Sequence, residues 1–246
     1  MTRAKYTLGV PRRDTMSKIL FVVTGADHWT LADGTEHPTG FWAEEAVAPY
    51  EAFKAAGHEI VVATPGGVVP TVDQGSLAPE ANGGQEGADR VAASLAAFTE
   101  LRRPVELADV DLADYAAVFY PGGHGPMEDL AADPESGALL VAALEAGTPL
   151  GVVCHAPAAL LAAVKGDGSN VFAGYRMTGF TNAEERQAGL AERAKWLLQD
   201  RLVEMGADFQ EGAPWAPYVV ADRSLVTGQN PASSAPLAAE LLKKLA

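Results

Sequence analysis

Residues 149–160 read PLGVVCHAPAAL, an apolar run that reaches Cys154 and passes at once into a Pro- and Ala-rich helix start. Such a run is typical of a buried strand that turns sharply into a helix and presents the turn residue at the strand's carboxyl end. Open α/β sheets bind their ligands at that end of the strands. The segment therefore predicts a nucleophile elbow with Cys154 at its tip.

Cys154 has two possible interpretations. The dipole and the unpaired N–H groups of a helix start stabilise a thiolate, which predicts a reactive sulfur. Free cysteine is also among the most buried residue types, so a small core residue on a strand would explain the same position. Both interpretations stay open until the surrounding motifs are considered.

Strand-like and helix-like segments alternate along the rest of the chain. Strands are expected at Lys18–Thr24, Glu59–Ala63, Ala116–Tyr120, Leu150–Val153, Arg176–Phe180, Tyr218–Ala221 and Leu225–Thr227. Helices are expected at Ala43–Ala56, Ala138–Ala146, Ala183–Leu190, Leu197–Met205 and Ala235–Leu245. The Gly-, Pro- and Asn-rich stretch Thr64–Asp89 is predicted to be a long loop. This alternation predicts a single-domain, doubly wound α/β fold, with a mostly parallel sheet sandwiched by helices.

Length and charge narrow the possible classes of protein. The chain has 246 residues, which suits one α/β domain. No stretch approaches the roughly 18–20 apolar residues of a membrane span, so no membrane association is expected. The formal net charge of −14 argues against nucleic acid as a partner, because nucleic-acid binding needs clustered Lys and Arg.

The amino-terminal segment and the single cysteine suggest where the protein works. Residues 1–15 are polar and mildly basic and are expected to form a flexible extension, with Met16 as an alternative start. The domain is expected to span residues 16–246. No hydrophobic signal core precedes the first strand, and one cysteine cannot form an internal disulfide, so a cytoplasmic location is predicted.

A catalytic cysteine needs a group that manages its proton and donors that bind an oxyanion. The ring of His155 should lie close to the thiol but point elsewhere, while its backbone N–H can donate to an oxyanion. A helix-start histidine bonded to a carboxylate is the alternative for His155. The motif PGGHG at 121–125 follows a neighbouring strand, and its glycines let N–H groups approach a ligand. Gly122, Gly123 and His124 are therefore candidate oxyanion or substrate-binding residues.

A pair of glutamates begins the first expected helix, in the motif GFWAEEAVAPY at 40–50. Acidic residues in a first turn are ordinarily surface charges favoured by the helix dipole. Glu44 and Glu45 lie about 100° apart around the helix, however, so one can face the interior while the other meets water. Trp42, in the same motif, is a candidate substrate contact.

The positions of the histidines exclude several classes of site. None follows His155, whereas class I glutamine amidotransferases and papain-like enzymes have one downstream. No His-x-x-x-His, cysteine pair or His-Glu-x-x-His is present, so no metal is predicted. A site built from His28, His37 or His124 with a glutamate stays possible. No Gly-x-Gly-x-x-Gly follows the first strand, and we expect neither nicotinamide, flavin nor another cofactor.

Three motifs in this order, GFWAEEAVAPY, PGGHG and VVCHAPA, closely resemble the ThiJ/PfpI superfamily. More narrowly, the chain is similar to its glutathione-independent glyoxalase and heat-shock chaperone branch, also described as class I glutamine amidotransferase-like. The resemblance runs from about Lys18 to Leu245. It implies a flavodoxin-like fold and, because members commonly dimerise, a homodimer.

The resemblance also implies roles for individual residues. Cys154 matches the nucleophile, Glu45 the buried acid that contacts the thiol, and His155 the elbow histidine. Glu185 falls at the position of the acidic partner of that histidine, with Glu184 a near-equal candidate. Gly123 and the His155 backbone match the oxyanion donors.

The implied reaction converts a 2-oxoaldehyde such as methylglyoxal to D-lactate. Cys154 would attack the aldehyde to give a hemithioacetal, and a proton would move from C1 to C2 through an enediolate, with Glu45 or His155 as the shuttle. Water would then release the product from a thioester.

Two other functions stay open. The first is a deglycase or holdase chaperone that acts on glycated or unfolded proteins. The second is an oxidative-stress sensor with an exposed thiol of low pKa. A protease is disfavoured, because that activity is associated with higher oligomers of the superfamily.

Overall fold

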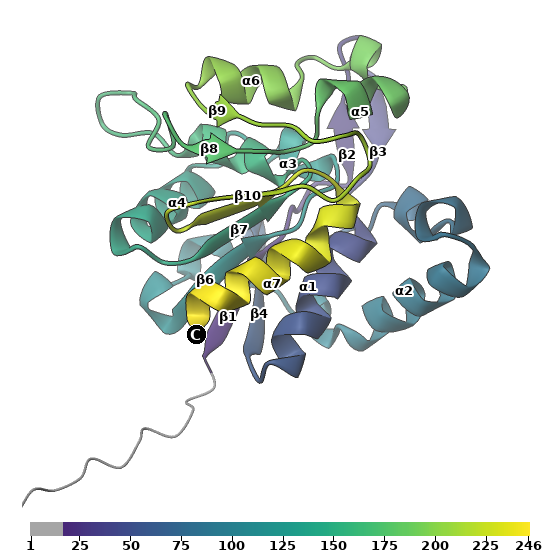
Figure 1. Ribbon diagram of the computed structural model, residues 1–246, viewed down its shortest axis with the longest axis horizontal. Coiled ribbons are helices and arrows are strands. Elements are labelled where there is room, and N and C mark those ends of the chain that lie inside the picture. Colours follow the sequence, from purple (N-terminus) through teal and green to yellow (C-terminus); the bar gives the residue numbers. More distant parts are fainter. Residues whose placement is uncertain (1–16) are drawn as a thin grey trace, which may run out of the picture.

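A seven-stranded sheet in the order β10-β11-β7-β6-β1-β4-β5 forms the centre of the computed structural model, which describes residues 17–246 (Figure 1). Every neighbouring pair is parallel except β10 and β11, which are antiparallel. The predicted doubly wound, mostly parallel α/β fold is confirmed. The extension expected at residues 1–15 lies outside the described residues.

The sheet consists of β1 (Lys18–Val22), β4 (Glu59–Thr64), β5 (Val105–Glu106), β6 (Tyr115–Tyr120), β7 (Leu150–Val153), β10 (Val219–Asp222) and β11 (Leu225–Gly228). Two small pairs lie outside it, β2 (His28–Thr30) with β3 (Glu36–Pro38) and β8 (Arg176–Met177) with β9 (Asp208–Phe209). The α-helices are α1 (Ala43–Ala55), α2 (Gln85–Ala97), α3 (Gly125–Glu128), α4 (Pro134–Ala146), α5 (Asn182–Gln187), α6 (Leu198–Glu204) and α7 (Ser234–Leu245).

Helices cover both faces of the sheet. Helices α1 and α7 lie side by side in front of it in Figure 1, with α3 and α4 behind. Residues 19–22 of β1 are all buried, as expected for a parallel strand covered on both sides. Phe21 packs edge-on against Phe53 of α1 and against Phe98, with ring centroids 5.9 and 5.6 Å away. These contacts fasten α1, and the glutamates at its start, to the central strands.

Two predicted segments differ from the structure. The long loop or excursion predicted for residues 64–89 contains short 3-10 turns, and its predicted end was wrong, because α2 begins at Gln85. Helix α2 buries Ala88 and Val91, whose helical spacing is hidden among glycines and polar residues. The strand expected as far as Phe180 ends at Met177, since the Phe180 N–H donates to the Cys154 carbonyl instead of to a neighbouring strand.

The order of the strands places a crevice at one edge of the sheet. The chain moves outward from β1 to β4 through α1, and in the opposite direction from β6 to β7 through α4. Doubly wound sheets bind ligands at the carboxyl ends of the strands where this direction reverses. The turns after β6 and β7, which carry the PGGHG motif and Cys154, both lie at that edge. Within residues 17–246, no helix has the length and apolar character needed to span a membrane.

Candidate active site

Cys154 occupies a strained turn directly after β7. Its φ is 61°, a left-handed conformation that is uncommon for residues other than glycine. Two hydrogen bonds hold the turn: the Cys154 N–H donates to the Gly228 carbonyl at 2.9 Å, and the Cys154 carbonyl accepts from the Phe180 N–H at 2.8 Å. A 3-10 helix follows at Ala156–Ala162. The structure thus contains the predicted elbow, with Cys154 at its tip.

The sulfur is almost completely enclosed. Cys154 is 4 % exposed, and its Sγ lies 3.3 Å from Nδ1 of His155. The expectation that this ring would point away from the thiol was therefore wrong. The ring turns back toward the sulfur because its other nitrogen is held by Glu185, as described below. A backbone N–H, that of Gly123, also interacts with the sulfur.

Glu45, in the first turn of α1, also reaches this sulfur. Its side chain is fully buried, whereas Glu44 points outward and pairs with Arg90 at 3.2 Å. The Gly122 N–H donates to Oε2 of Glu45 at 2.8 Å, while Oε1 accepts no hydrogen bond from a nitrogen or oxygen of the described residues. The carboxyl also contacts the Cys154 thiol. The inward and outward pair expected from the helical geometry is thus present.

Burial controls the protonation of these two groups. It raises the pKa of Glu45 to about 8, although the thiol and the Gly122 N–H partly offset it. Burial, followed by the nearby charge of Glu45, raises the pKa of Cys154 well above its ordinary value. Of the two interpretations left open for Cys154, the surroundings of the sulfur thus favour a buried thiol over a stabilised thiolate in the resting protein. The short 3-10 helix start does not outweigh an enclosed sulfur beside a carboxyl.

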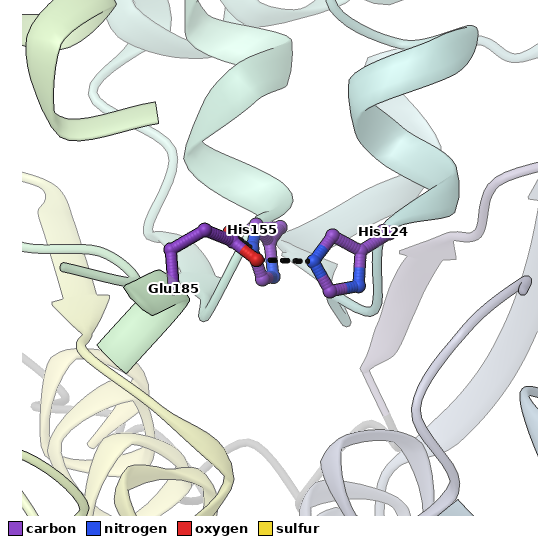
Figure 2. A group of neighbouring side chains, drawn as sticks. All are labelled: His124, His155 and Glu185. Carbon is purple, nitrogen blue, oxygen red and sulfur yellow. Dashed lines mark hydrogen bonds and ion pairs between the residues drawn. The ribbon is translucent and has the colours of Figure 1, made fainter. Parts of the chain in front are cut away.

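The carboxylate of Glu185 interacts with two histidines, His155 of the elbow and His124 (Figure 2). Oε2 of Glu185 lies 2.7 Å from Nε2 of His155, and Oε1 lies 2.9 Å from Nε2 of His124. The two rings are 4.0 Å apart, and the ring of His124 stacks on Trp29. His155 therefore contacts the thiol through one ring nitrogen and a carboxylate through the other.

The surroundings favour a neutral His155 and an ionised Glu185. Burial and the adjacent ring of His124 lower the pKa of His155 to about 4. Burial alone would raise the pKa of Glu185, but the charges and hydrogen bonds of the two histidines outweigh it and hold this pKa well below its usual range. At neutral pH, Nδ1 of His155 can therefore accept a proton from the sulfur.

Glu184, the near-equal candidate in the sequence, lies in a different environment. It forms a capping box with Thr181 at the start of α5. It also accepts hydrogen bonds from the Trp215 N–H and from the side-chain amides of Gln229 and Asn230, at 2.8, 3.1 and 2.8 Å. Glu184 thus holds together the segments around the site, while Glu185 faces His155.

A small cavity of about 90 Å³ opens onto the sulfur. Its lining includes Cys154, His155, Trp42, Phe180 and Trp215. A larger cavity of about 500 Å³ shares Trp42 with it and is also lined by residues of the segment 71–75. Trp42 therefore stands between the reactive cavity and the larger one, in keeping with its selection as a substrate contact.

The two consecutive glycines of the PGGHG motif, Gly122 and Gly123, are placed differently. A Cβ on Gly122 would lie 2.7 Å from Oε2 of Glu45, so the missing side chain makes room for the buried carboxyl. Gly123 has a φ of 93°, which only glycine adopts without strain, and it lines the small cavity. The sequence did not indicate that Gly122 makes room for the Glu45 carboxyl and donates a hydrogen bond to it.

The sequence left open a site built from His28, His37 or His124 with a glutamate, but it did not show that His124 shares Glu185 with His155. These residues are separated by 61 and 30 positions from Glu185, so motif spacing could not find them. Their three ligand-type atoms lie within 4.8 Å of one another. The prediction of no metal rested on spacing alone, and the fold assembles a set of potential ligands that spacing cannot detect.

The fold and this site define a class of doubly wound α/β proteins centred on an elbow cysteine beside a buried glutamate. Residues 38–244 match the model of the DJ-1/PfpI family. The chain belongs to the DJ-1/PfpI family, and the resemblance noted in the sequence is confirmed.

Relatives in this family include enzymes. The chain is 28 % identical over 236 residues to "Glyoxalase 3" of Candida albicans, covering 92 % of this chain and 98 % of the relative. It is 29 % identical over 239 residues to "Protein/nucleic acid deglycase HchA" of Escherichia coli O157:H7, covering 93 % and 79 %. It is 35 % identical to the human "Glutamine amidotransferase-like class 1 domain-containing protein 1", but over only 56 % of this chain and 63 % of that protein.

Solved structures share the fold over nearly the whole chain. Glyoxalase III of Candida albicans has a TM-score of 0.81 and 26 % identity, covering 93 % of this chain and 97 % of that one. The Rapid Encystment Protein 24 KDa of Francisella tularensis has a TM-score of 0.82 and 27 % identity, covering 94 % and 100 %.

Proposed function

We propose that the protein is a glutathione-independent glyoxalase that converts a 2-oxoaldehyde such as methylglyoxal to D-lactate. The main support is the position of the Cys154 sulfur, between the protonated carboxyl of Glu45 and Nδ1 of His155, which lies 3.3 Å away. A proton acceptor and a proton donor that both contact one nucleophile are what this isomerisation needs. The similarity to a glyoxalase over almost the full length of both chains adds to this support.

In the first step, the thiol adds to the aldehyde carbon. His155 Nδ1 takes the thiol proton as the carbon–sulfur bond forms, and the resulting imidazolium is stabilised by Glu185. The carbonyl oxygen takes a proton from Glu45, which gives a hemithioacetal and leaves Glu45 ionised. Because His155 begins neutral and Glu45 begins protonated, each starts in the state that this step requires.

In the second step, a proton moves between the two carbons. The ionised Glu45 removes the proton from C1, and the electron pair forms an enediolate with its negative charge on the C2 oxygen. Glu45 then returns the proton to C2. His155 gives its proton to the C2 oxygen and accepts one from the C1 hydroxyl, so a thioester of lactate results. The N–H of Gly123, which interacts with the sulfur, is the candidate donor to the charged oxygen, and loss of one such donor typically costs about 3–4 kcal/mol.

In the last step, water releases the product. The ionised Glu45 accepts a proton from water, which attacks the thioester carbon. His155 gives its proton to the departing sulfur, which restores the thiol, the neutral ring and the protonated carboxyl. No external oxidant or reductant is needed, because one carbon is oxidised as the other is reduced.

A deglycase is the second candidate. The cavity at the sulfur is small, about 90 Å³, but the neighbouring cavity of about 500 Å³ shares Trp42 and His124 with it. A glycated side chain could occupy both cavities, and the similarity to HchA supports this alternative. An oxidation sensor is less well supported, because the thiol is enclosed and its pKa is raised.

Methylglyoxal turnover without glutathione tests the proposal. Wild type should form D-lactate, Cys154→Ala should form none, and Glu45→Gln should be slower by about 10²–10⁴-fold, as for loss of a general acid–base group. Glu44→Gln is the matched control. Its side chain points outward from the same helical turn, so its turnover should match that of wild type. Equal consumption of the aldehyde by all four proteins would refute an enzymatic role for this site.

A second substrate distinguishes the candidates. A peptide carrying a methylglyoxal-derived hemithioacetal or aminocarbinol should be repaired faster than free methylglyoxal is converted if the protein is mainly a deglycase. Faster conversion of the free aldehyde favours the glyoxalase.

A further inference from the structure

Two histidines and one glutamate converge at a point that the proposed reaction does not fully use. The reaction uses Nδ1 of His155, but the Nε2 atoms of both His155 and His124 point at Glu185 (Figure 2). These two nitrogens and the carboxylate lie within 4.8 Å of one another, and all three residues are buried. We propose that His124, His155 and Glu185 form an inhibitory site for a borderline divalent cation such as zinc.

The donor set indicates the class of ion. Two imidazole nitrogens with one carboxylate suit zinc, cobalt, nickel or ferrous iron, whereas magnesium and calcium prefer oxygen ligands alone. A zinc ion about 2 Å from each ligand atom needs about 3.3 Å between ligand atoms. The nitrogen–oxygen separations are 2.9 and 2.7 Å, each to a different oxygen of Glu185, and the three ligand-type atoms lie within 4.8 Å of one another, so the side chains must adjust around the ion to admit it. Water can supply the fourth ligand.

The larger cavity offers a route of entry. His124 lines both cavities and is therefore the member of the trio that an arriving ion meets first. Asp27 and Asp73 line the same larger cavity. Negative charges along a cleft raise the local concentration of cations, and the net charge of −14 acts in the same direction.

Inhibition follows from the two nitrogens of one ring. Without metal, the Nε2–H groups of His155 and His124 donate to Glu185, because an ionised carboxylate only accepts. A cation takes the Nε2 lone pair, so the ring proton of each histidine moves to Nδ1. On His155, that proton then faces the sulfur, and the ring can no longer accept the thiol proton. The sulfur itself contacts the opposite side of this ring, at Nδ1, so Cys154 is not a ligand.

Zinc binding to the chelator-treated protein tests the site directly. Zinc chloride titrated against a competing chromophoric chelator should show one ion bound per wild-type chain. His124→Gln should weaken zinc binding at least about 10–100-fold. Replacing a residue that only positions a metal ligand already weakens metal binding by that factor, and His124 is itself a ligand in this proposal. Glutamine can still donate to Glu185, and a thermal unfolding scan checks that the variant is folded.

Two further variants separate this site from other zinc-binding groups. Cys154→Ala should keep its zinc, since the sulfur is not a ligand. His28→Ala should also keep it, although His28 lies 2.8 Å from Asp27 and 3.7 Å from Glu128 and is another place where zinc could bind. Absence of binding, binding unchanged in His124→Gln, or binding lost in Cys154→Ala or His28→Ala would overturn the proposal.

The inhibitory part rests on the proposed function and is measured separately. Turnover of methylglyoxal by wild type should fall in proportion to zinc occupancy. Full occupancy without slower turnover would overturn the inhibitory role. A protein that binds zinc as expected but never converts the aldehyde would refute the glyoxalase and leave the metal site intact.

Discussion

Glu45 and Glu185 are two carboxyl groups in the first turns of two helices, both buried, yet their pKa values move in opposite directions. Burial raises the pKa of Glu45 to about 8, while the two histidines hold that of Glu185 well below its usual range. The difference lies in their partners. Glu45 accepts one backbone N–H and contacts the Cys154 thiol, and its other oxygen accepts no hydrogen bond from a nitrogen or oxygen within residues 17–246, whereas each oxygen of Glu185 meets an imidazole. Partners, rather than depth of burial, decide which glutamate is ionised.

This contrast separates two kinds of chemistry within one site. A carboxyl that keeps its proton at neutral pH can donate it, while a permanently ionised one can only orient and stabilise a positive ring. The elbow cysteine lies between them and contacts Glu45 directly but Glu185 only through His155.

The largest effect expected from this contrast is a pH-dependent stability that belongs to Glu45. Its pKa rises from 4.5 to about 8 on folding, so the folded state holds this proton more tightly. The stabilisation is complete below the unfolded pKa and is lost as the pH rises through about 8. At about 1.4 kcal/mol per pH unit, the free energy of unfolding should fall by on the order of 4 kcal/mol across this range.

Denaturant unfolding of wild type and of Glu45→Gln, at values from about pH 5 to about pH 8.5, measures this decrease in the free energy of unfolding. In Glu45→Gln the free energy of unfolding should not fall by this amount as the pH rises. In Glu44→Gln it should fall as it does in wild type. Parallel pH profiles for wild type and Glu45→Gln would mean that the carboxyl is not protonated in the folded protein.

A series of amide substitutions should show a smaller, graded effect. Glu184→Gln should destabilise most, by about 2–4 kcal/mol, because both of its oxygens accept donors and an amide nitrogen would face one of them. Glu185→Gln should cost about 1–2 kcal/mol, since a histidine can switch tautomer to accept from the new amide. Glu45→Gln should be within about 1 kcal/mol of wild type at pH 6, where Glu45 is already neutral.

Unfolding free energies at pH 6 give this order. If Glu45→Gln were the most destabilised of the three, the pairing pattern would not explain the contrast between the two carboxyls.

A third test concerns the backbone N–H donor to Glu45. Gly122→Ala would place a Cβ 2.6 Å from the Val153 carbonyl and 2.7 Å from the Glu45 carboxyl, so we expect a loss of about 1–3 kcal/mol from overpacking. Gly166→Ala is the matched control, because nothing lies within 4 Å of its added Cβ. Equal stabilities for the two variants in thermal unfolding would show that the turn after β6 accommodates the added Cβ without a loss of stability.

Most of the fold could be predicted because its strands are short apolar runs bounded by clear turn residues. The segment Leu150–Val153 matches β7 at both ends, and the strands expected at Tyr218–Ala221 and Leu225–Thr227 are present as β10 and β11. Helix α2 was missed because its start is rich in glycine and polar residues. Its face is completed only by contact with α1, and such tertiary packing leaves a weak local pattern.

The site was only partly predictable for a similar reason. Cys154, Glu45 and the two candidates at residues 184 and 185 were identified, but sequence alone could not choose between the latter. The choice depends on which carboxyl meets His155 after α5 packs beside the elbow. The raised pKa of the thiol was likewise hidden, because burial of the sulfur is a property of the assembled structure.

The backbone of the elbow limits which side chains can replace the nucleophile. With φ at 61°, a branched β-carbon at residue 154 would collide with its own main chain. Serine can stand there, but threonine cannot without unbending the turn. The backbone conformation at residue 154 thus restricts which hydroxyl or thiol residues can replace the cysteine. In a library of nucleophilic residues substituted at this position, those with a branched β-carbon should be excluded by the backbone geometry, whatever their reactivity.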